Sequence, residues 1–397
     1  MKFLIQIPQL IYGGAEKVLV NFANDLIVRG HEVEILESYE KGFLKPQFDS
    51  RVTFNAICSK EYTKRYYASL EEIKKEKNIK KKAFKCTKLV FSRVVGYRRF
   101  AEYLSKKYYK DKKYDVAINY LEIESPKFMK TAICAKKYVQ WYHIDASDKE
   151  VKKNTDSMIL WYQKMDAIIC VAESARKSFI EIYPQLKNKT YTIYNFFDTE
   201  KIIKQAEKKF IYSKFEVGVI KLLSVGRMTS QKAYLRFLEI LGKLREEGYN
   251  FQWYVLGDGI ERKKIESKII ELNLENNVIL EGLTDNPYKY MKNCDLFVLP
   301  SEYEGFPTVT VEAKVLGCPV LATDVSGIRE QITHGKTGWI VDNNENSIYE
   351  GLKYLLENPE VRESLRINDK IDRICNSDIK YKRLMEILSI EVEKDEK

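Results

Sequence analysis

Short apolar runs alternate with helical segments along almost the whole chain, and this alternation constrains the fold more than any other feature. Runs such as 2–8 and 296–299 are mostly apolar and only a few residues long, which is typical of strands buried on both faces of a parallel sheet. Segments between them, such as 17–30, repeat apolar residues at helical spacing. Strands that alternate with helices predict an α/β protein with a parallel sheet in each half of the 397-residue chain.

The pattern also predicts where the domains divide. A polar run at 199–214 interrupts the alternation, so we expect a first domain at 1–198, a linker at 199–214 and a second domain at 215–379. The last helical segment is predicted at 380–392. The predicted strands are 2–8, 32–36, 114–120, 137–142, 167–171, 190–194, 219–225, 253–256, 278–281, 296–299, 319–323 and 339–341.

The stretch 295–312 is the most informative part of the second half. A buried strand at 296–299 leads into a polar loop, and Pro307 stands where a helix could begin. Parallel sheets bind anions and polar ligands where strands give way to helix starts. Glu304 lies in this loop and Glu312 follows about two helical turns later. The two carboxylates could hold the two ends of a hydroxylated ligand, or both could simply be solvated.

A pair of cations follows the strand predicted at 219–225. Gly226 and Arg227 come directly after that strand, and Lys232 precedes the next helix. Arginine binds phosphate oxygens in a bidentate manner and lysine acts as a point charge. Two such cations beside a strand-to-helix turn predict a clamp for a diphosphate.

Two features of the first half could take part in a site. Gly13 and Gly14 follow the first strand, where small residues let the backbone approach an anion at a helix N-terminus, although a plain tight turn is the alternative. The G-x-G-x-x-G dinucleotide fingerprint is absent. His143 follows the strand predicted at 137–142, which is the edge where parallel sheets place ligands. Taken alone, His143 could equally be structural.

The positive charge of the protein is local. Residues 74–110 contain 14 Lys and Arg but only the acids Glu76 and Glu102, whereas the whole chain has a net charge of +10. Apolar residues such as Phe84, Phe91 and Phe100 are interleaved with these cations. A basic amphipathic helix is typical of a membrane-surface segment, and a solvated helix packed on its domain is the alternative. No nucleic-acid-binding module accompanies the charge.

Composition excludes several other classes. The seven cysteines are scattered without a C-x-x-C pair, which fits a reducing cytoplasm. Three histidines and the lack of any D-x-D triplet leave no histidine-rich metal site and no usual carboxylate pair for a metal on a diphosphate. No apolar run approaches 18 residues, so no membrane-spanning helix is expected.

Several motifs together resemble glycosyltransferase family 4, whose members are retaining nucleotide-sugar transferases with two Rossmann-like domains in the GT-B fold. The motifs are E-G-F-P-x-x-x-x-E from Glu304 to Glu312, the Arg and Lys five residues apart, and G-G-A-E after the first strand. One position departs from the family, because Ala233 stands where glycine usually follows the lysine. The fold implied by the resemblance also brings the C-terminal helix, 380–397, back onto the first domain.

The resemblance implies a role for each candidate residue. Arg227 and Lys232 would neutralise the leaving diphosphate, and His143 and Glu304 would face the donor sugar. Glu312 would bind the ribose. Further contacts to the donor would come from Gly13, Gly14, Gly226, Asp258, Gly259, Leu283, Gly305, Phe306, Pro307 and Thr308, and the turn at Asp258 and Gly259 would lie near the nucleotide base.

The resemblance also implies a substrate class and a location. We expect transfer of a hexose or N-acetylhexosamine from a UDP-sugar, without a metal or other cofactor, to a glycan or polyprenyl-lipid-linked acceptor in capsular or exopolysaccharide synthesis. Residues 74–110 would hold the protein at the inner face of the cell membrane, and no nucleic acid is expected as a partner. An inactive scaffolding subunit of the same fold and a GT-B sugar phosphorylase are the alternatives.

Overall fold

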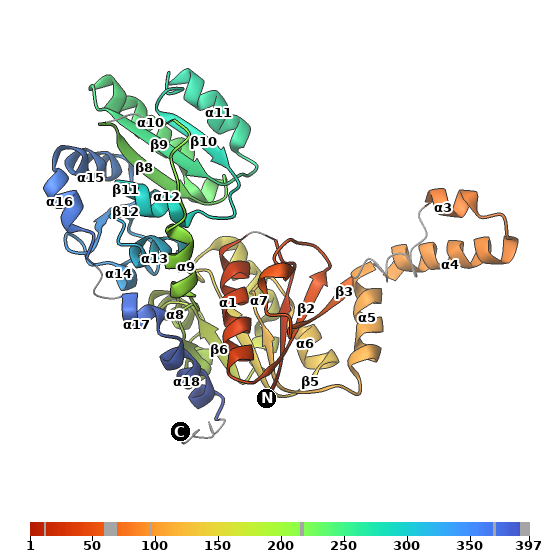
Figure 1. Ribbon diagram of the computed structural model, residues 1–397. Coiled ribbons are helices and arrows are strands. Elements are labelled where there is room, and N and C mark those ends of the chain that lie inside the picture. Colours follow the sequence, from red (N-terminus) through yellow and green to blue (C-terminus); the bar gives the residue numbers. More distant parts are fainter. Residues whose placement is uncertain (12, 59–69, 96, 215–217, 368–370, 390–397) are drawn as a thin grey trace. The chain divides into compact units, whose positions relative to one another are not determined.

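The protein forms two compact α/β units, each built on its own parallel sheet (Figure 1). The computed structural model describes residues 1–397 except 12, 59–69, 96, 215–217, 368–370 and 390–397. Unit 1 comprises Met1–Cys170, Phe179–Thr192 and Lys382–Lys397. Unit 2 comprises Val171–Ser178 and Ile193–Tyr381.

The sheet of unit 1 has seven parallel strands in the order β3-β2-β1-β4-β5-β6-β7. The strands are β1 (Lys2–Ile7), β2 (Glu32–Tyr39), β3 (Thr53–Cys58), β4 (Lys113–Asn119), β5 (Cys134–Tyr142), β6 (Ala167–Cys170) and β7 (Thr190–Thr192). The helices are α1 (Gly14–Val28), α3 (Leu70–Lys75), α4 (Ile79–Val95), α5 (Tyr97–Tyr109), α6 (Pro126–Ala132), α7 (Lys149–Tyr162) and α8 (Glu173–Ile182), whose first residues group with unit 2. The strand order reverses between β1 and β4, so the loops after these two strands flank the switch point of unit 1.

The sheet of unit 2 has six parallel strands in the order β10-β9-β8-β11-β12-β13. The strands are β8 (Ile220–Val225), β9 (Phe251–Leu256), β10 (Val278–Gly282), β11 (Leu296–Leu299), β12 (Val320–Thr323) and β13 (Trp339–Val341). The helices are α9 (Thr199–Ala206), α10 (Tyr234–Glu246), α11 (Arg262–Glu271), α12 (Tyr288–Asn293), α13 (Thr308–Val315), α14 (Ile328–Gln331), α15 (Glu345–Glu357), α16 (Pro359–Ser364), α17 (Ile371–Cys375) and α18 (Ser377–Ile387). The switch point of unit 2 lies between β8 and β11.

Both faces of the unit 2 sheet are covered. Successive residues of a strand point to opposite faces, and Trp253 of β9 belongs to a different core cluster from its neighbour Tyr254. The first cluster includes residues of α10, α11 and α15, and the second includes residues of α9, α12 and α13. A polar ligand is therefore excluded from the faces of this sheet, and its carboxyl edge is the place where one could bind.

The parallel α/β architecture confirms the predicted fold class, and three local differences have physical causes. The sequence did not predict β3, an edge strand in which only the last two residues, Ile57 and Cys58, are buried. Pro307 is the residue before α13 instead of its first residue. The 199–214 segment contains the amphipathic helix α9, which buries Ile202 and Ala206 in unit 2 instead of standing apart as a linker. At the other end of the chain, residues from Lys382 onward group with unit 1.

The basic segment 74–110 folds as separate helices that differ in burial. The end of α5 packs on unit 1, where Ser105 and Tyr109 are buried and the Tyr109 hydroxyl donates to Glu34 at 2.9 Å. Phe84 and Val90 of α4 are 61% and 60% exposed. The side chains of Phe91 and Phe100 lie outside the part of the chain that the structure describes. No helix among the described residues is long and apolar enough to cross a membrane.

Candidate active site

Three loops interlock at the carboxyl edge of the unit 2 sheet, after β8, β9 and β10. The Gly226 N–H donates to the Leu256 carbonyl at 2.9 Å, and the Met228 N–H donates to the Asp258 carbonyl at 3.0 Å. Gly257 has a φ of +137°, and a Cβ there would lie 2.0 Å from the Gly226 oxygen. Only glycine permits this backbone and this approach. The structure thus brings together the loops that carry the predicted residues Gly226, Asp258 and Gly259.

Lys232 and Glu304 form an ion pair across the switch point of unit 2. Lys232 ends the loop after β8, Glu304 lies in the loop after β11, and Lys232 Nζ donates to Glu304 Oε1 at 2.7 Å. Their side chains are only 13% and 10% exposed. The sequence had assigned them to different parts of a ligand and did not predict this pair. An ammonium group has three protons, so two remain for another acceptor.

Two neutral side chains support Glu304, and neither was predicted from the sequence. Ser301 Oγ donates to Glu304 Oε1 at 2.8 Å, and Gln231 Nε2 lies 3.4 Å from Oε2. The Glu302 N–H donates to the Gln231 carbonyl at 2.9 Å, which ties the two loops together. Gln231 directly precedes Lys232, and Ser301 lies three residues before Glu304 in the same loop, so proximity in sequence was the available signal.

Arg227 is a cation that is available to a ligand. Its side chain is exposed and lies five residues before Lys232 in the same loop. Its guanidinium has no hydrogen bond or ion pair to any residue that the structure describes. Ala233, after the short 3₁₀ turn that ends at Lys232, has a φ of +52°. The left-handed backbone there explains why glycine is favoured at this position, and alanine adopts it at a cost of about 1 kcal/mol.

Helix α13 and the loop before it hold the remaining predicted residues of the β11 connection. Glu312 is 3% exposed and faces the Tyr288 hydroxyl at 3.5 Å. The backbone at Gly305 and Phe306 packs tightly, because a Cβ on Gly327 would lie 2.9 Å from the Gly305 oxygen. Pro307 caps α13 and Thr308 begins it. The predicted residues from Glu304 to Glu312 therefore lie in the loop after β11 and in the first turns of α13.

Asp258 and Leu283 occupy the outer part of the same edge. Asp258 is exposed, and its carboxylate accepts the Gly259 N–H at 2.7 Å. Leu283 follows β10 and is 68% exposed. An exposed leucine directly after a strand offers an apolar surface for a planar group.

Gly13, Gly14 and His143 belong to unit 1, at the carboxyl edge of its own sheet. Gly13 precedes α1 and Gly14 begins it. His143 follows β5, is 9% exposed and has a buried Nε2 with no hydrogen-bond partner among the described residues. Its ring centroid lies 4.7 Å from that of Tyr120. A buried ring nitrogen without a partner has a free capacity to bind a polar ligand.

Burial lowers the pKa of His143 to about 3, against which a hydrogen bond to the Tyr120 backbone acts weakly. The unfolded chain has the ordinary pKa near 6.5 and therefore binds more protons as the pH falls below that value. We expect the contribution of His143 to lower the free energy of unfolding by about 1.4 kcal/mol for each pH unit below 6.5. The difference in unfolding free energy between the wild type and His143→Gln should therefore be smaller at pH 4.5 than at pH 7 in urea titrations. An equal difference at the two pH values would show that the imidazole is not held neutral.

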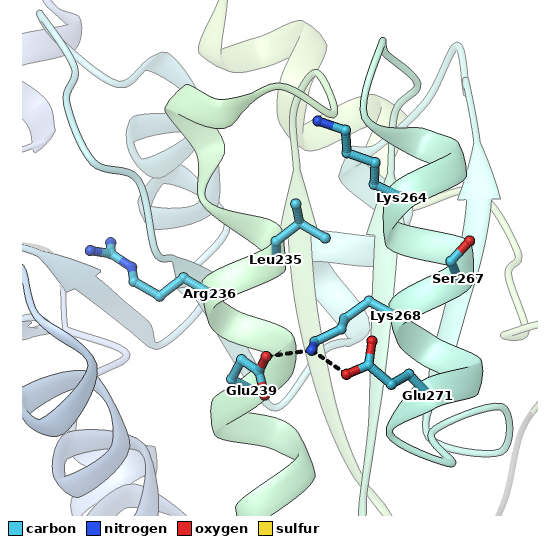
Figure 2. A pocket seen from close by; sticks show the side chains of 7 residues that line it. All are labelled: Leu235, Arg236, Glu239, Lys264, Ser267, Lys268 and Glu271. Atoms are coloured by element: carbon cyan, nitrogen blue, oxygen red, sulfur yellow. Dashed lines mark hydrogen bonds and ion pairs between the residues drawn. The ribbon is translucent and has the colours of Figure 1, made fainter.

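A surface groove of unit 2 lies apart from these residues, between α10 and α11 (Figure 2). Lys268 donates to both Glu239, at a short contact of 2.5 Å, and Glu271, at 2.7 Å (Figure 2). Lys268 is thus paired with both carboxylates within the groove. The groove also includes Lys264 but none of the predicted site residues.

Sequence comparisons link the second unit to a known family. The family described as "Glycosyl transferases group 1" matches residues 205–372, which lie in unit 2. The chain is 32% identical over 225 residues to the N-acetylgalactosamine-N,N'-diacetylbacillosaminyl-diphospho-undecaprenol 4-alpha-N-acetylgalactosaminyltransferase of Campylobacter jejuni, over 54% of this chain and 59% of that protein. It is 26% identical over 255 residues to the capsular polysaccharide biosynthesis glycosyltransferase CapM of Staphylococcus aureus, over 60% and 66%. The chain therefore matches less than two thirds of the length of either relative.

Solved structures resemble the whole chain. Anabaena Alr3699/HepE, in complex with UDP and glucose, aligns with a TM-score of 0.72 at 17% identity and covers 98% of this chain and 99% of that one. S. aureus TarM, in complex with UDP and sugar ligands, aligns with a TM-score of 0.73 at 16% identity over 98% and 99%. At this identity the likeness establishes the fold alone. The chain has the fold of the GT-B glycosyltransferases, as its sequence predicted.

Proposed function

We propose that this protein is a retaining glycosyltransferase that moves a hexose or N-acetylhexosamine from a UDP-sugar to a glycan or lipid-linked acceptor in surface polysaccharide synthesis. One observation carries the proposal. At the switch point of unit 2, the exposed guanidinium of Arg227 adjoins the loop that ends in Lys232, and Lys232 is paired with Glu304. Cations for a diphosphate and a carboxylate for sugar hydroxyls are the groups that a nucleotide-sugar donor requires.

The proposed roles follow from the charges and positions. Arg227, with two protons of Lys232, would neutralise the charge that develops on the leaving diphosphate, which a metal does in other enzymes. Glu304 would accept hydrogen bonds from the sugar hydroxyls, and the backbone at Gly305 and Phe306 would hold the same sugar. Glu312 would hold the ribose. The leaving phosphate itself would take the acceptor's proton, so no side chain needs to act as a nucleophile, and no metal is required.

Unit 1 carries groups of the kind that such a donor requires. The backbone N–H groups at Gly14, at the start of a 15-residue helix, favour an anion such as the diphosphate. His143, neutral and with an unpartnered Nε2, can share a hydrogen bond with a sugar hydroxyl without adding charge.

The donor can be tested with a thermal-shift panel of UDP, GDP and ADP and their sugars. A ligand that binds only the native state stabilises it by about 2.7 kcal/mol at 100 times its Kd. We expect UDP and a UDP-sugar to raise the midpoint of unfolding. Stabilisation by GDP or ADP alone would contradict the choice of nucleotide, and no stabilisation by any of them would contradict the proposed site.

A second assay separates the proposal from its two alternatives. A transferase releases UDP from its donor in the presence of an acceptor, and an inactive scaffold does not. A sugar phosphorylase would instead require inorganic phosphate for turnover. Release of UDP that does not depend on inorganic phosphate is the expected result.

We further propose that α4 places the enzyme on the cytoplasmic face of the cell membrane, beside a lipid-linked acceptor. Lys80, Lys81 and Lys82 are exposed on the same helix as the exposed Phe84 and Val90. Cations beside exposed apolar side chains favour an anionic lipid surface. The Campylobacter relative acts, by its name, on an undecaprenol-diphosphate-linked sugar, which supports an acceptor of this kind.

Liposome binding tests this docking. Each lysine near an anionic surface contributes about 1 kcal/mol, so Lys81→Glu with Lys82→Glu should weaken binding to phosphatidylserine vesicles at least roughly 30-fold. Binding of the wild type should fall steeply with salt. The matched control is Lys208→Glu with Lys209→Glu, the same charge change at exposed positions of unit 2. Equal binding to neutral and anionic vesicles, or equal loss in the control, would contradict the proposal.

A further inference from the structure

Three buried amides form a row across the carboxyl ends of β1, β4 and β5. Gln6 is in register with Asn119, and Asn119 is in register with Gln140. All three side chains are fully buried, and Asn119 Nδ2 donates to Gln140 Oε1 at 2.7 Å. A buried amide without hydrogen-bond partners is destabilising by about 1–3 kcal/mol. The remaining donors and acceptors of these three side chains therefore need partners from elsewhere in the fold.

The loop after β4, residues 120–125, supplies those groups through Glu124. Gln6 Nε2 donates to Glu124 Oε2 at 3.0 Å, and Asn119 Nδ2 donates to the Glu124 carbonyl at 3.0 Å. Glu124 is 2% exposed. The side chain and the backbone of one residue are thus both bound to the sheet, which fixes the loop at the switch point of unit 1.

The same loop carries a second buried carboxylate, Glu122, which is 1% exposed. Its Oε2 accepts the backbone N–H of His143 at 3.1 Å. Strand β5 ends at Tyr142, so this N–H lies beyond the strand and Glu122 gives it an acceptor. His143 is therefore held by the loop on two sides, by Glu122 at its backbone and by Tyr120 at its ring.

We propose that Glu122 is a positioning residue for His143, because its carboxylate fixes the backbone from which the unpartnered imidazole nitrogen is presented to a ligand. The Nε2 of His143 would then meet a hydroxyl of a bound sugar, and this part of the inference rests on the proposed function. The hydrogen bond between Glu122 and the His143 backbone is observed in the structure and does not depend on the proposed function.

Ionisation of Glu122 sets the strength of this contact. Burial raises the pKa of Glu122 to about 7, and the nearby Asp148 raises it further, while the backbone N–H groups of Glu122 and His143 lower it. The other titratable groups that face it are Tyr142 on β5 and Tyr162 on α7. A proton on the carboxyl removes the charge that strengthens the hydrogen bond to His143. The environment of His143 should therefore change near neutral pH, although its own ring stays neutral there.

Imidazole NMR can observe this change directly, because the chain has only three histidines. In the intact protein with labelled histidine, the His143 resonance would be assigned by its loss in His143→Gln. We expect its chemical shift to follow pH with an inflection near 7 while its ¹⁵N shifts remain those of a neutral ring. Glu122→Gln, which keeps an acceptor oxygen but cannot ionise, should abolish the inflection.

Glu34→Gln is the matched control. Glu34 is a buried carboxylate of the same sheet that accepts from Tyr109 and Tyr114 and makes no contact with His143, so the inflection should persist in this variant. A wild-type His143 resonance without an inflection between pH 5.5 and 8.5 would overturn the proposal, even if Glu122→Gln failed to fold. An inflection that survives Glu122→Gln, or that Glu34→Gln also removes, would overturn it as well.

Turnover gives an independent reading once the donor is known. The kcat of the wild type should fall severalfold from pH 8 to pH 6 with little change in KM, and that of Glu122→Gln should stay level. If no nucleotide sugar binds but the NMR inflection follows Glu122, the proposed function fails and the positioning role stands. If transfer occurs and the inflection is absent, the reverse holds.

Discussion

Arg227→Ala is expected to lower the turnover number about 10²–10³-fold, which is the usual loss when one charge-stabilising donor is removed from an active site. Arg227 is exposed, and its guanidinium makes no ion pair within the described part of the chain. Its removal should therefore leave the midpoint of thermal unfolding almost unchanged. The measurement is the initial rate of UDP release from the donor, with the unfolding midpoint recorded for the same preparation.

Two further variants make this prediction specific. Glu304→Gln should lower turnover more than it weakens UDP binding, because positive charge builds on the sugar as its bond to phosphate breaks. Glu312→Ala should mainly raise KM, because a ribose contact stabilises substrate and transition state alike. Near wild-type transfer by both Arg227→Ala and Glu304→Gln would show that the active site lies elsewhere.

Lys232→Met is expected to destabilise the protein by about 3 kcal/mol, in addition to its effect on transfer. Lys232 Nζ and Glu304 Oε1 are 2.7 Å apart in a nearly buried pair. Methionine fills similar space but leaves the Glu304 carboxylate, among the residues that the structure describes, with only the neutral donors Ser301 and Gln231. An uncompensated buried charge is strongly destabilising, and urea titration would measure the loss.

The double variant tests the cause. Glu304→Gln in the Lys232→Met background removes the stranded charge, so the double variant should be more stable than Lys232→Met alone, with a coupling energy of about 1 kcal/mol or more. Additive losses would show that Lys232 stabilises the protein by packing and not through Glu304.

The parallel strands were predictable because their signal is local. Runs such as 296–299 and 339–341 coincide with β11 and β13, since a strand buried on both faces must be apolar throughout. Edge strand β3 was not predicted because only its last two residues, Ile57 and Cys58, are buried. Helix α9 escaped because its two buried residues, Ile202 and Ala206, are sparse in a polar sequence and their partners lie far along the chain.

The sequence singled out the residues of the candidate site but not the contacts between them. Spacing within the segment after β8 singled out Arg227 and Lys232, and spacing within the segment after β11 singled out Glu304 and Glu312. It could not show that Lys232 reaches Glu304, because 72 residues separate them and only the strand order β8-β11 makes their loops neighbours. Glu122 was missed for the same reason. Its partner is the backbone N–H of the residue after the adjacent strand. Every residue except proline has such an N–H, so no residue type in the sequence indicates this contact.

The central claim is that the carboxyl edge of the six-stranded sheet binds a nucleoside diphosphate, and calorimetric titration with UDP tests it most directly. The account predicts one site in the wild type, weaker binding in Arg227→Ala and in Glu312→Ala, and unchanged binding in Glu34→Gln, whose substitution lies in unit 1. UDP that binds the wild type, Arg227→Ala and Glu312→Ala with equal affinity would contradict the account.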